Sequence, residues 1–162
     1  MIILKDIFYK VAIESVNGST DIAVGKIEFD SREIQKNDVF VAIRGSVYDG
    51  HKYIQKAIEF GAVAIVCDSF PDIFENGITY VQVKDTNKAL AFMAANYFGD
   101  PSKDLKLVGI TGTNGKTTIA SLLYQLFKKA GFKVGLLSTV KILVDNTEYK
   151  TMHTTPDSIT IN

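Results

Sequence analysis

The stretch Gly112–Thr118, which reads G-T-N-G-K-T-T, constrains the fold more than any other. An apolar run at residues 105–110 precedes it, and an amphipathic segment at residues 119–130 follows it. Strand, glycine-rich turn and helix in this order are the setting of a phosphate-binding loop. The glycines let successive N–H groups turn toward one anion, and the helix start adds further unpaired N–H groups. We therefore predict a nucleotide-binding loop made of Gly112, Thr113, Asn114, Gly115, Lys116, Thr117 and Thr118.

Two residues of this loop have chemical roles of their own. Lys116 brings a full positive charge to the β- and γ-phosphates, so it is the candidate catalytic residue. Thr117 brings a hydroxyl to the position that usually holds Mg²⁺. The pattern departs from the common G-x-x-x-x-G-K-[ST] form, because Ile110 stands where its first glycine belongs. The lysine directly after Gly115 and the helical pattern behind it favour phosphate binding over an ordinary turn before a helix.

The composition is that of a globular protein without a strongly charged surface. The 162 residues suffice for one ordinary domain or two small ones, and 46% of them are hydrophobic. With 18 basic and 18 acidic residues the net charge is zero, which argues against nucleic-acid binding through a broad positive surface. No apolar run approaches the roughly 20 residues that span a bilayer, and the N-terminus lacks a signal-peptide pattern. We expect a cytoplasmic protein without nucleic-acid or membrane partners.

The cysteine and histidines offer no catalytic or metal-binding pattern. The single cysteine, Cys67, lies in an apolar run and is predicted to be a small buried hydrophobe. The two histidines, His51 and His153, are far apart, so neither a metal-ligand spacing nor a triad can be argued.

The apolar periodicity predicts an α/β fold in two parts. The first part should contain helices at 4–13, 53–60 and 86–98 and strands at 22–29, 39–43, 62–67 and 78–83. Gly99-Asp100-Pro101-Ser102 is the clearest break, so we predict domains at 1–100 and 101–162. In the second part, strands at 106–110 and 133–140 around the helix should form a parallel βαβ unit, with 148–152 returning as a hairpin. A Rossmann-like nucleotide domain normally has more strands, so the chain resembles the beginning of one.

Three polar stretches follow predicted strands. Asp30-Ser31-Arg32 and Asp49-Gly50-His51 should lie at the carboxyl ends of strands, where α/β proteins bind ligands. His153-Thr154-Thr155-Pro156 comes later, and Pro156 biases Thr155 toward an extended conformation. Each stretch can be a simple turn or part of a substrate site. His51 is interpreted as a helix-start residue rather than a catalytic group.

These stretches together resemble the Mur ligase family of peptidoglycan synthesis over nearly the whole chain. They agree with the family in order and spacing, and G-T-N-G-K-T is the family form of the nucleotide loop. The chain is most similar to the members that add a diamino acid. Members that add D-Ala-D-Ala usually have Ser where Thr113-Asn114 stand, and they lack the T-T-P-D-S stretch at 154–158.

The resemblance implies a small α/β domain that binds the UDP of UDP-MurNAc-L-Ala-D-Glu, followed by the first βαβ part of a Rossmann-like ATP-binding domain. ATP would bind at Gly112–Thr118 with Mg²⁺ at Thr117. The D-Glu carboxylate would be activated as an acyl phosphate, which the amine of meso-diaminopimelate or L-lysine attacks. The implied contacts to the UDP-MurNAc-dipeptide are Phe29, Ser31, Ser46, Val47, Tyr48, Thr154 and Thr155.

The resemblance also implies what these 162 residues do not contain. Family members continue into a metal-binding Glu and His, a carbamylated lysine and a C-terminal domain that binds the incoming amino acid. We therefore expect the full-length protein to be a monomeric ATP-dependent ligase and this chain alone to be inactive. Two alternatives stay open, a non-catalytic UDP-sugar or nucleotide-binding module and the D-Ala-D-Ala-adding ligase. A simple P-loop NTPase fits poorly, because no Asp-ended apolar strand follows.

Overall fold

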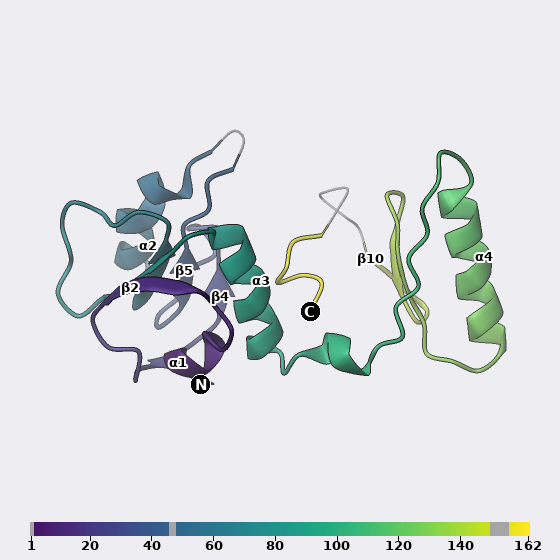
Figure 1. Cartoon of the computed structure of the whole chain (residues 1–162), viewed down its shortest axis with the longest axis horizontal. Helices are drawn as coiled ribbons and strands as arrows, with labels where there is room; N and C mark the ends of the chain where they lie inside the picture. The colour runs from purple at the N-terminus through teal and green to yellow at the C-terminus, as the bar shows by residue number, and fades with distance from the viewer. Residues whose placement is uncertain (1, 46–47, 150–155) are drawn as a thin grey trace. The chain divides into compact units, whose positions relative to one another are not determined.

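The computed structural model describes residues 2–45, 48–149 and 156–162. The chain separates into two compact units between Lys103 and Asp104 (Figure 1). The predicted α/β fold class is confirmed, since helices accompany a parallel sheet in the first unit. None of the helices in the described ranges is long and apolar enough to cross a membrane.

A five-stranded sheet organises the first unit. Its order is β2 (Ile13–Asn17), β7 (Thr79–Val83), β6 (Ala64–Cys67), β5 (Val39–Val41), β4 (Ile27–Glu28). The strands β4, β5, β6 and β7 are parallel to one another, and β2 lies antiparallel to β7 at one edge. Every residue of β5 and β6 is buried, as the continuous apolar runs predict for strands covered on both faces.

Helices and short elements complete this unit. The helix α3 (Thr86–Tyr97) begins where predicted, because the Asp85 carboxylate accepts the N–H of Lys88 at 3.0 Å. The 3₁₀ helix η1 (Gly50–Tyr53) leads into α2 (Ile54–Glu59), and α1 (Leu4–Ile7) contacts α3. The strand β1 (Ile2–Ile3) pairs with β3 (Ala23–Val24). A central buried cluster contains Ile34, Phe40, Ala42, Ile54, Ala57, Ala62, Ile65, Cys67 and Tyr80.

Cys67 occupies the buried position that the sequence predicts. Its side chain is fully buried in the cluster, and burial raises the pKa of its thiol to about 12. The thiol therefore stays protonated near neutral pH and acts as a small hydrophobe rather than a nucleophile.

Two predictions for the first unit are wrong in their bounds. The helix predicted at 4–13 ends at Ile7, and Lys10 adopts a left-handed backbone with φ of 63°. Residues from Ile13 onward form β2 instead, because the free edge of β7 offers backbone partners that local periodicity does not reveal. The strand predicted at 22–29 is split into β3 and β4, and between them the N–H of Gly25 bonds the Asn37 carbonyl at 2.7 Å.

The second unit contains one long helix and a small antiparallel sheet. The helix α4 (Lys116–Lys129) matches the predicted amphipathic segment. The sheet has the order β10 (Thr147–Tyr149), β9 (Ile142–Val144), β8 (Gly135–Leu137), so the predicted hairpin return is confirmed for β10. The hydroxyl of Tyr124 donates to the carbonyl of Asp145, which ties α4 to the β9–β10 turn. The 3₁₀ helix η2 (Pro101–Asp104) leads into this unit.

The strand predicted at 106–110 is absent, and with it the parallel βαβ pairing. The strand β8 pairs antiparallel with β9, and no parallel partner for β8 occurs within the described part of this unit. Leu107 and Val108 are 89% and 60% exposed. An apolar run forms a strand only where neighbouring strands bond its N–H and C=O groups, and the sequence of the run does not supply such neighbours.

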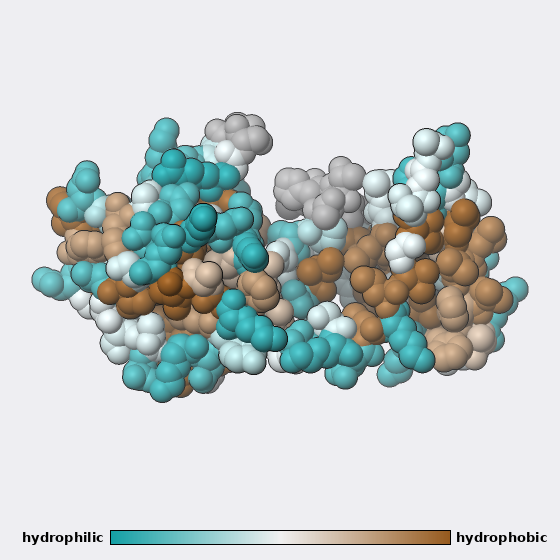
Figure 2. Space-filling model, viewed as in Figure 1, coloured by the Kyte–Doolittle hydropathy of each residue, from teal (hydrophilic) through white to brown (hydrophobic). Residues whose placement is uncertain are grey.

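A broad apolar surface covers the second unit. Figure 2 shows hydrophobic residues gathered over it. The stripe that the sequence predicts as the buried face of α4 is largely exposed. The exposed apolar side chains of this unit include Leu105, Leu107, Val108, Ile119, Leu122, Leu126, Phe127, Phe132, Leu137, Val140 and Val144.

Candidate functional site

The predicted phosphate loop has the backbone of an anion-binding helix start. Gly112 and Gly115 have φ of 145° and 78°, in the region that favours glycine. No side chain caps the start of α4, and Ile119 is the first residue whose N–H bonds back, to the Gly115 carbonyl at 2.9 Å. The N–H groups at residues 116–118 therefore lack intrahelical partners and are available to an anion, which the helix dipole favours at this end.

The side chain of Lys116 folds back onto the loop that precedes it. Its ammonium donates to the carbonyls of Gly112 at 2.6 Å and Thr113 at 3.3 Å. Residues 111–119 are all exposed, so a nucleotide can reach the loop from solvent. Phosphate oxygens are stronger acceptors than neutral carbonyls, so the ammonium can exchange its present partners for a bound phosphate.

The prediction that Thr117 binds magnesium is supported only by the chemistry of its hydroxyl group. A hydroxyl oxygen fits the preference of Mg²⁺ for oxygen ligands, with the remaining positions filled by water and phosphate oxygens. No group of three or more His, Cys, Asp or Glu side chains in the described ranges could hold a metal ion. Magnesium at Thr117 therefore stays a prediction.

The predicted UDP loop is a short hairpin after β5. Arg44 and Asp49 form its base as an antiparallel bridge, and the N–H of Gly45 bonds the Tyr48 carbonyl at 2.8 Å. At position 50 only glycine fits, because a Cβ would lie 2.7 Å from the backbone nitrogen of Ile43. Tyr48 is 72% exposed, so its ring is free to contact a ligand. The other predicted contacts here, Ser46 and Val47, lie outside the described residues.

In the segment after β4, Asp30 and Ser31 differ in their hydrogen bonding. The guanidinium of Arg32 forms a bidentate pair with Asp30, at 2.9 Å between Nε and Oδ1 and 2.6 Å between Nη2 and Oδ2, and this pair lowers the pKa of Asp30. Asp30 therefore serves the turn, as the simpler interpretation has it. Ser31 is buried, and its hydroxyl bonds none of the residues that the structure describes. Phe29, partly exposed, precedes it.

The two loops leave the same edge of the sheet. The strands β4 and β5 are adjacent and parallel, so the segments that follow them start side by side at the carboxyl ends. The structure thus brings Phe29, Ser31 and Tyr48 to one edge of the first unit. Thr154 and Thr155 lie outside the described residues.

Sequence reasoning missed a polar network beneath the hairpin. His51 lies between the carboxylates of Asp49 and Asp68, and Asp68 in turn pairs with Arg44. Asp68 directly follows the buried strand β6. A polar residue that follows a buried strand, as also occurs after β4 and β5, is the sequence signal that could have identified Asp68.

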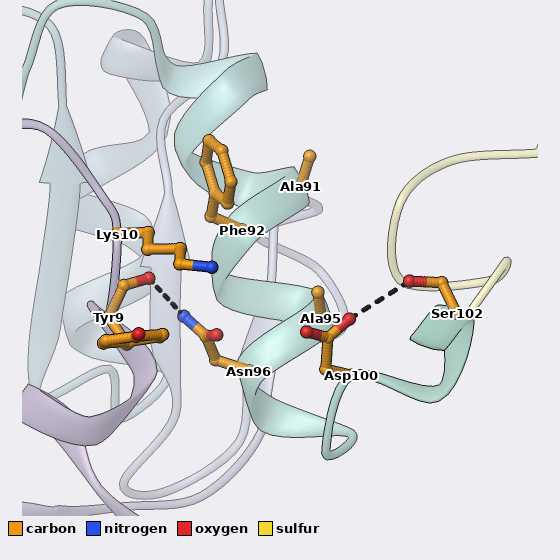
Figure 3. A pocket seen from close by; sticks show the side chains of 8 residues that line it. All are labelled: Tyr9, Lys10, Ala91, Phe92, Ala95, Asn96, Asp100 and Ser102. Atoms are coloured by element: carbon orange, nitrogen blue, oxygen red, sulfur yellow. Dashed lines mark hydrogen bonds between the residues drawn. The ribbon is translucent and has the colours of Figure 1, made fainter. Parts of the chain in front are cut away.

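Two cavities adjoin α3. The one in Figure 3 has a volume of about 260 Å³. Two polar side chains that line this cavity already have partners within the protein. The amide of Asn96 donates to the carbonyls of Ile7 and Tyr9, and the hydroxyl of Ser102 donates to Asp100. The second, of about 590 Å³, is lined in part by Arg44, Asp68 and Lys84 at the carboxyl ends of β5 to β7.

Comparison with known proteins assigns the family. A model of the Mur ligase catalytic domain matches residues 24–98, and a model of the Mur ligase middle domain matches residues 110–162. The chain belongs to the Mur ligase family. The family resemblance seen in the sequence is therefore confirmed.

Relatives of this Mur ligase chain have a consistent name. It is 49% identical over 160 residues to the UDP-N-acetylmuramoyl-L-alanyl-D-glutamate--2,6-diaminopimelate ligase of Cytophaga hutchinsonii, covering 98% of this chain and 33% of the relative. It is 46% identical to the ligase of the same name from Parabacteroides distasonis, with the same coverage. The chain spans about a third of the length of these relatives.

A solved structure of a UDP-N-acetylmuramoyl-L-alanyl-D-glutamate--2,6-diaminopimelate ligase superposes on 99% of this chain and 32% of its own, with a TM-score of 0.70 and 20% identity. At that identity the likeness shows that the Mur ligase chain shares the fold.

Proposed function

We propose that this chain is part of an ATP-dependent ligase that joins a diamino acid to UDP-MurNAc-L-Ala-D-Glu in peptidoglycan precursor synthesis. One observation carries the proposal, the uncapped start of α4 behind G-T-N-G with Lys116 at its first position. The names of the relatives support 2,6-diaminopimelate as the diamino acid and do not favour the D-Ala-D-Ala-adding alternative. A cytoplasmic monomer remains our expectation.

In this proposal the second unit binds ATP. The free N–H groups at residues 116–118 and the ammonium of Lys116 would surround the β- and γ-phosphates. When the γ-phosphoryl group moves to the D-Glu carboxylate, negative charge spreads over its oxygens, and Lys116 stabilises that charge. Magnesium, held in part by the Thr117 hydroxyl, would neutralise further phosphate charge.

The first unit would bind the UDP end of the substrate. The Ser31 hydroxyl, which has no partner among the described residues, can donate to a uracil carbonyl or a phosphate oxygen. The exposed rings of Phe29 and Tyr48 can pack against the ligand from the two loops. The predicted contacts at Ser46 and Val47, and at Thr154 and Thr155 toward the muramoyl-dipeptide, belong to the same proposal.

A serine substitution tests this assignment. We expect Ser31→Ala to weaken binding of UDP-MurNAc-L-Ala-D-Glu by roughly threefold to a hundredfold, the range for losing one neutral or phosphate hydrogen bond. The affinity for ATP should not change, because the nucleotide loop lies in the other unit. Titration calorimetry on the full-length protein measures both affinities.

The matched control is Ser102→Ala, since the exposed Ser102 bonds only Asp100 among the described residues. It should leave both affinities as they are. An effect of Ser31→Ala on ATP alone would mean that the UDP-sugar is assigned to the wrong unit.

A further inference from the structure

His51 connects two parts of the first unit. Its side chain is 13% exposed, its Nδ1 lies 2.8 Å from Oδ1 of Asp49, and its Nε2 lies 3.1 Å from Oδ1 of Asp68. Asp49 belongs to the base of the hairpin, whereas Asp68 follows β6. The imidazole therefore bridges the hairpin and the end of a central strand.

Asp68 holds the other leg of the same hairpin. Its carboxylate pairs with Arg44, at 3.0 Å between Nε and Oδ2 and 3.1 Å between Nη2 and Oδ1. Arg44 also donates to the Ser69 hydroxyl at 2.9 Å, and the side chain of Gln82 in β7 donates to the Asp68 carbonyl at 3.0 Å. Arg44 thus pairs with Asp68 directly, and Asp49 is linked to Asp68 through His51. The backbone of Asp68 is itself bonded by Gln82 of the sheet.

The bridge persists in either protonation state of the imidazole. With a proton on Nδ1, which donates to Asp49, a neutral ring accepts the N–H of Asp68 at Nε2, at 3.3 Å. A protonated ring donates from Nε2 to the Asp68 carboxylate instead. Both nitrogens are engaged in each state, so the imidazole can link the two segments in either form.

We propose that His51 and Asp68 are positioning residues for substrate binding. They hold Arg44 and Asp49, the two residues that flank Gly45 and Tyr48, and so keep the Tyr48 ring in a ligand-binding position. The inference rests on the proposed function, because Tyr48 is one of the predicted UDP contacts. A side chain whose flanking backbone is already held in place loses less conformational freedom when the ligand binds, so the bridge increases affinity without touching the ligand.

Two substitutions of the histidine separate positioning from general stability. The side-chain amide of asparagine can take the place of Nδ1 toward Asp49 but does not reach Asp68, whereas the longer glutamine can. In the full-length enzyme we expect His51→Asn to raise the KM for UDP-MurNAc-L-Ala-D-Glu by about tenfold, as the loss of a hydrogen bond to a charged partner would. The kcat and the KM for ATP should not change. His51→Gln should restore most of the loss.

A second pair of variants keeps the inference testable if His51→Asn folds poorly. Asp68→Asn retains the size of the side chain but removes the charge that holds Arg44, so it should raise the same KM to a similar extent. The matched control, Asp21→Asn, removes the exposed ion pair with Lys5 and should leave every parameter unchanged.

The outcomes are distinct. Unchanged KM in both His51→Asn and Asp68→Asn, equal loss in His51→Asn and His51→Gln, or a fall in kcat at constant KM would each overturn the positioning role and leave the proposed function intact. Failure of the wild-type protein to bind the UDP substrate would overturn both.

Discussion

Replacement of Lys116 by alanine in the full-length protein is expected to lower the ligation rate by about 10²–10³-fold. Lys116 is the one cationic residue in the stretch Gly112–Thr118, and it stands at the first position of α4. Removing one preorganised donor from the developing charge of a transition state has an effect of this size. Single-turnover measurement of ADP release and of peptide product would give the rate of the chemical step.

Lys129→Ala provides the matched control for Lys116→Ala. Lys129 is an exposed lysine in the last turn of the same helix, so its loss changes the net charge equally without approaching the loop. It should keep the wild-type rate. A Lys116→Ala protein that retained more than about a tenth of the rate would show that another cation stabilises the transferred phosphoryl group, since a single donor is normally worth more than that.

Hydrogen exchange of the 162-residue chain is expected to show two units of very different stability. The first unit buries β5, β6 and most of β7 completely, whereas the second leaves most of the apolar stripe of α4 exposed. Burial of apolar surface is the main favourable term in folding, so the second unit lacks much of its driving force. We expect amides in β5–β7 to exchange at least about a hundredfold more slowly than those in α4, because local opening follows local burial.

The full-length protein is the control for this comparison. The relatives are about three times as long as this chain, so further polypeptide is expected to cover the apolar surface of the second unit. The amides of α4 should then be protected as well. Equal protection of α4 and β5–β7 in the 162-residue chain would show that the second unit is as stable as the first, contrary to this expectation.

Local signals in the sequence predicted the elements that depend on local physics. The glycines before Lys116 predicted the uncapped helix start, Asp85 predicted the start of α3, and the continuous apolar runs predicted β5 and β6 as buried strands. Each of these depends on residues within a few positions of one another. The left-handed turn at Lys10 and the pairing of β2 with β7 depend on residues far apart in the sequence, so apolar spacing at 4–13 indicated a longer helix.

The residues of the candidate site also divide into those that local patterns indicate and those that depend on distant parts of the chain. The positions of Ser31, Tyr48 and Lys116 at the ends of strands or the start of a helix followed from local patterns. The network of Arg44, His51 and Asp68 joins three segments through side chains, and no spacing within one segment indicates it. The strand expected at 106–110 failed for a related reason, because strand pairing depends on neighbours that an apolar run does not specify.

The ligation reaction of the full-length protein tests the proposed function as a whole. Purified protein would be supplied with UDP-MurNAc-L-Ala-D-Glu, ATP, Mg²⁺ and either meso-diaminopimelate or L-lysine, and the products would be followed by mass spectrometry. We expect ATP-dependent formation of the UDP-MurNAc-tripeptide with meso-diaminopimelate, together with ADP and phosphate, and no product from the 162-residue chain alone. Absence of tripeptide with both diamino acids, or addition of D-Ala-D-Ala to a UDP-MurNAc-tripeptide instead, would contradict the proposed function.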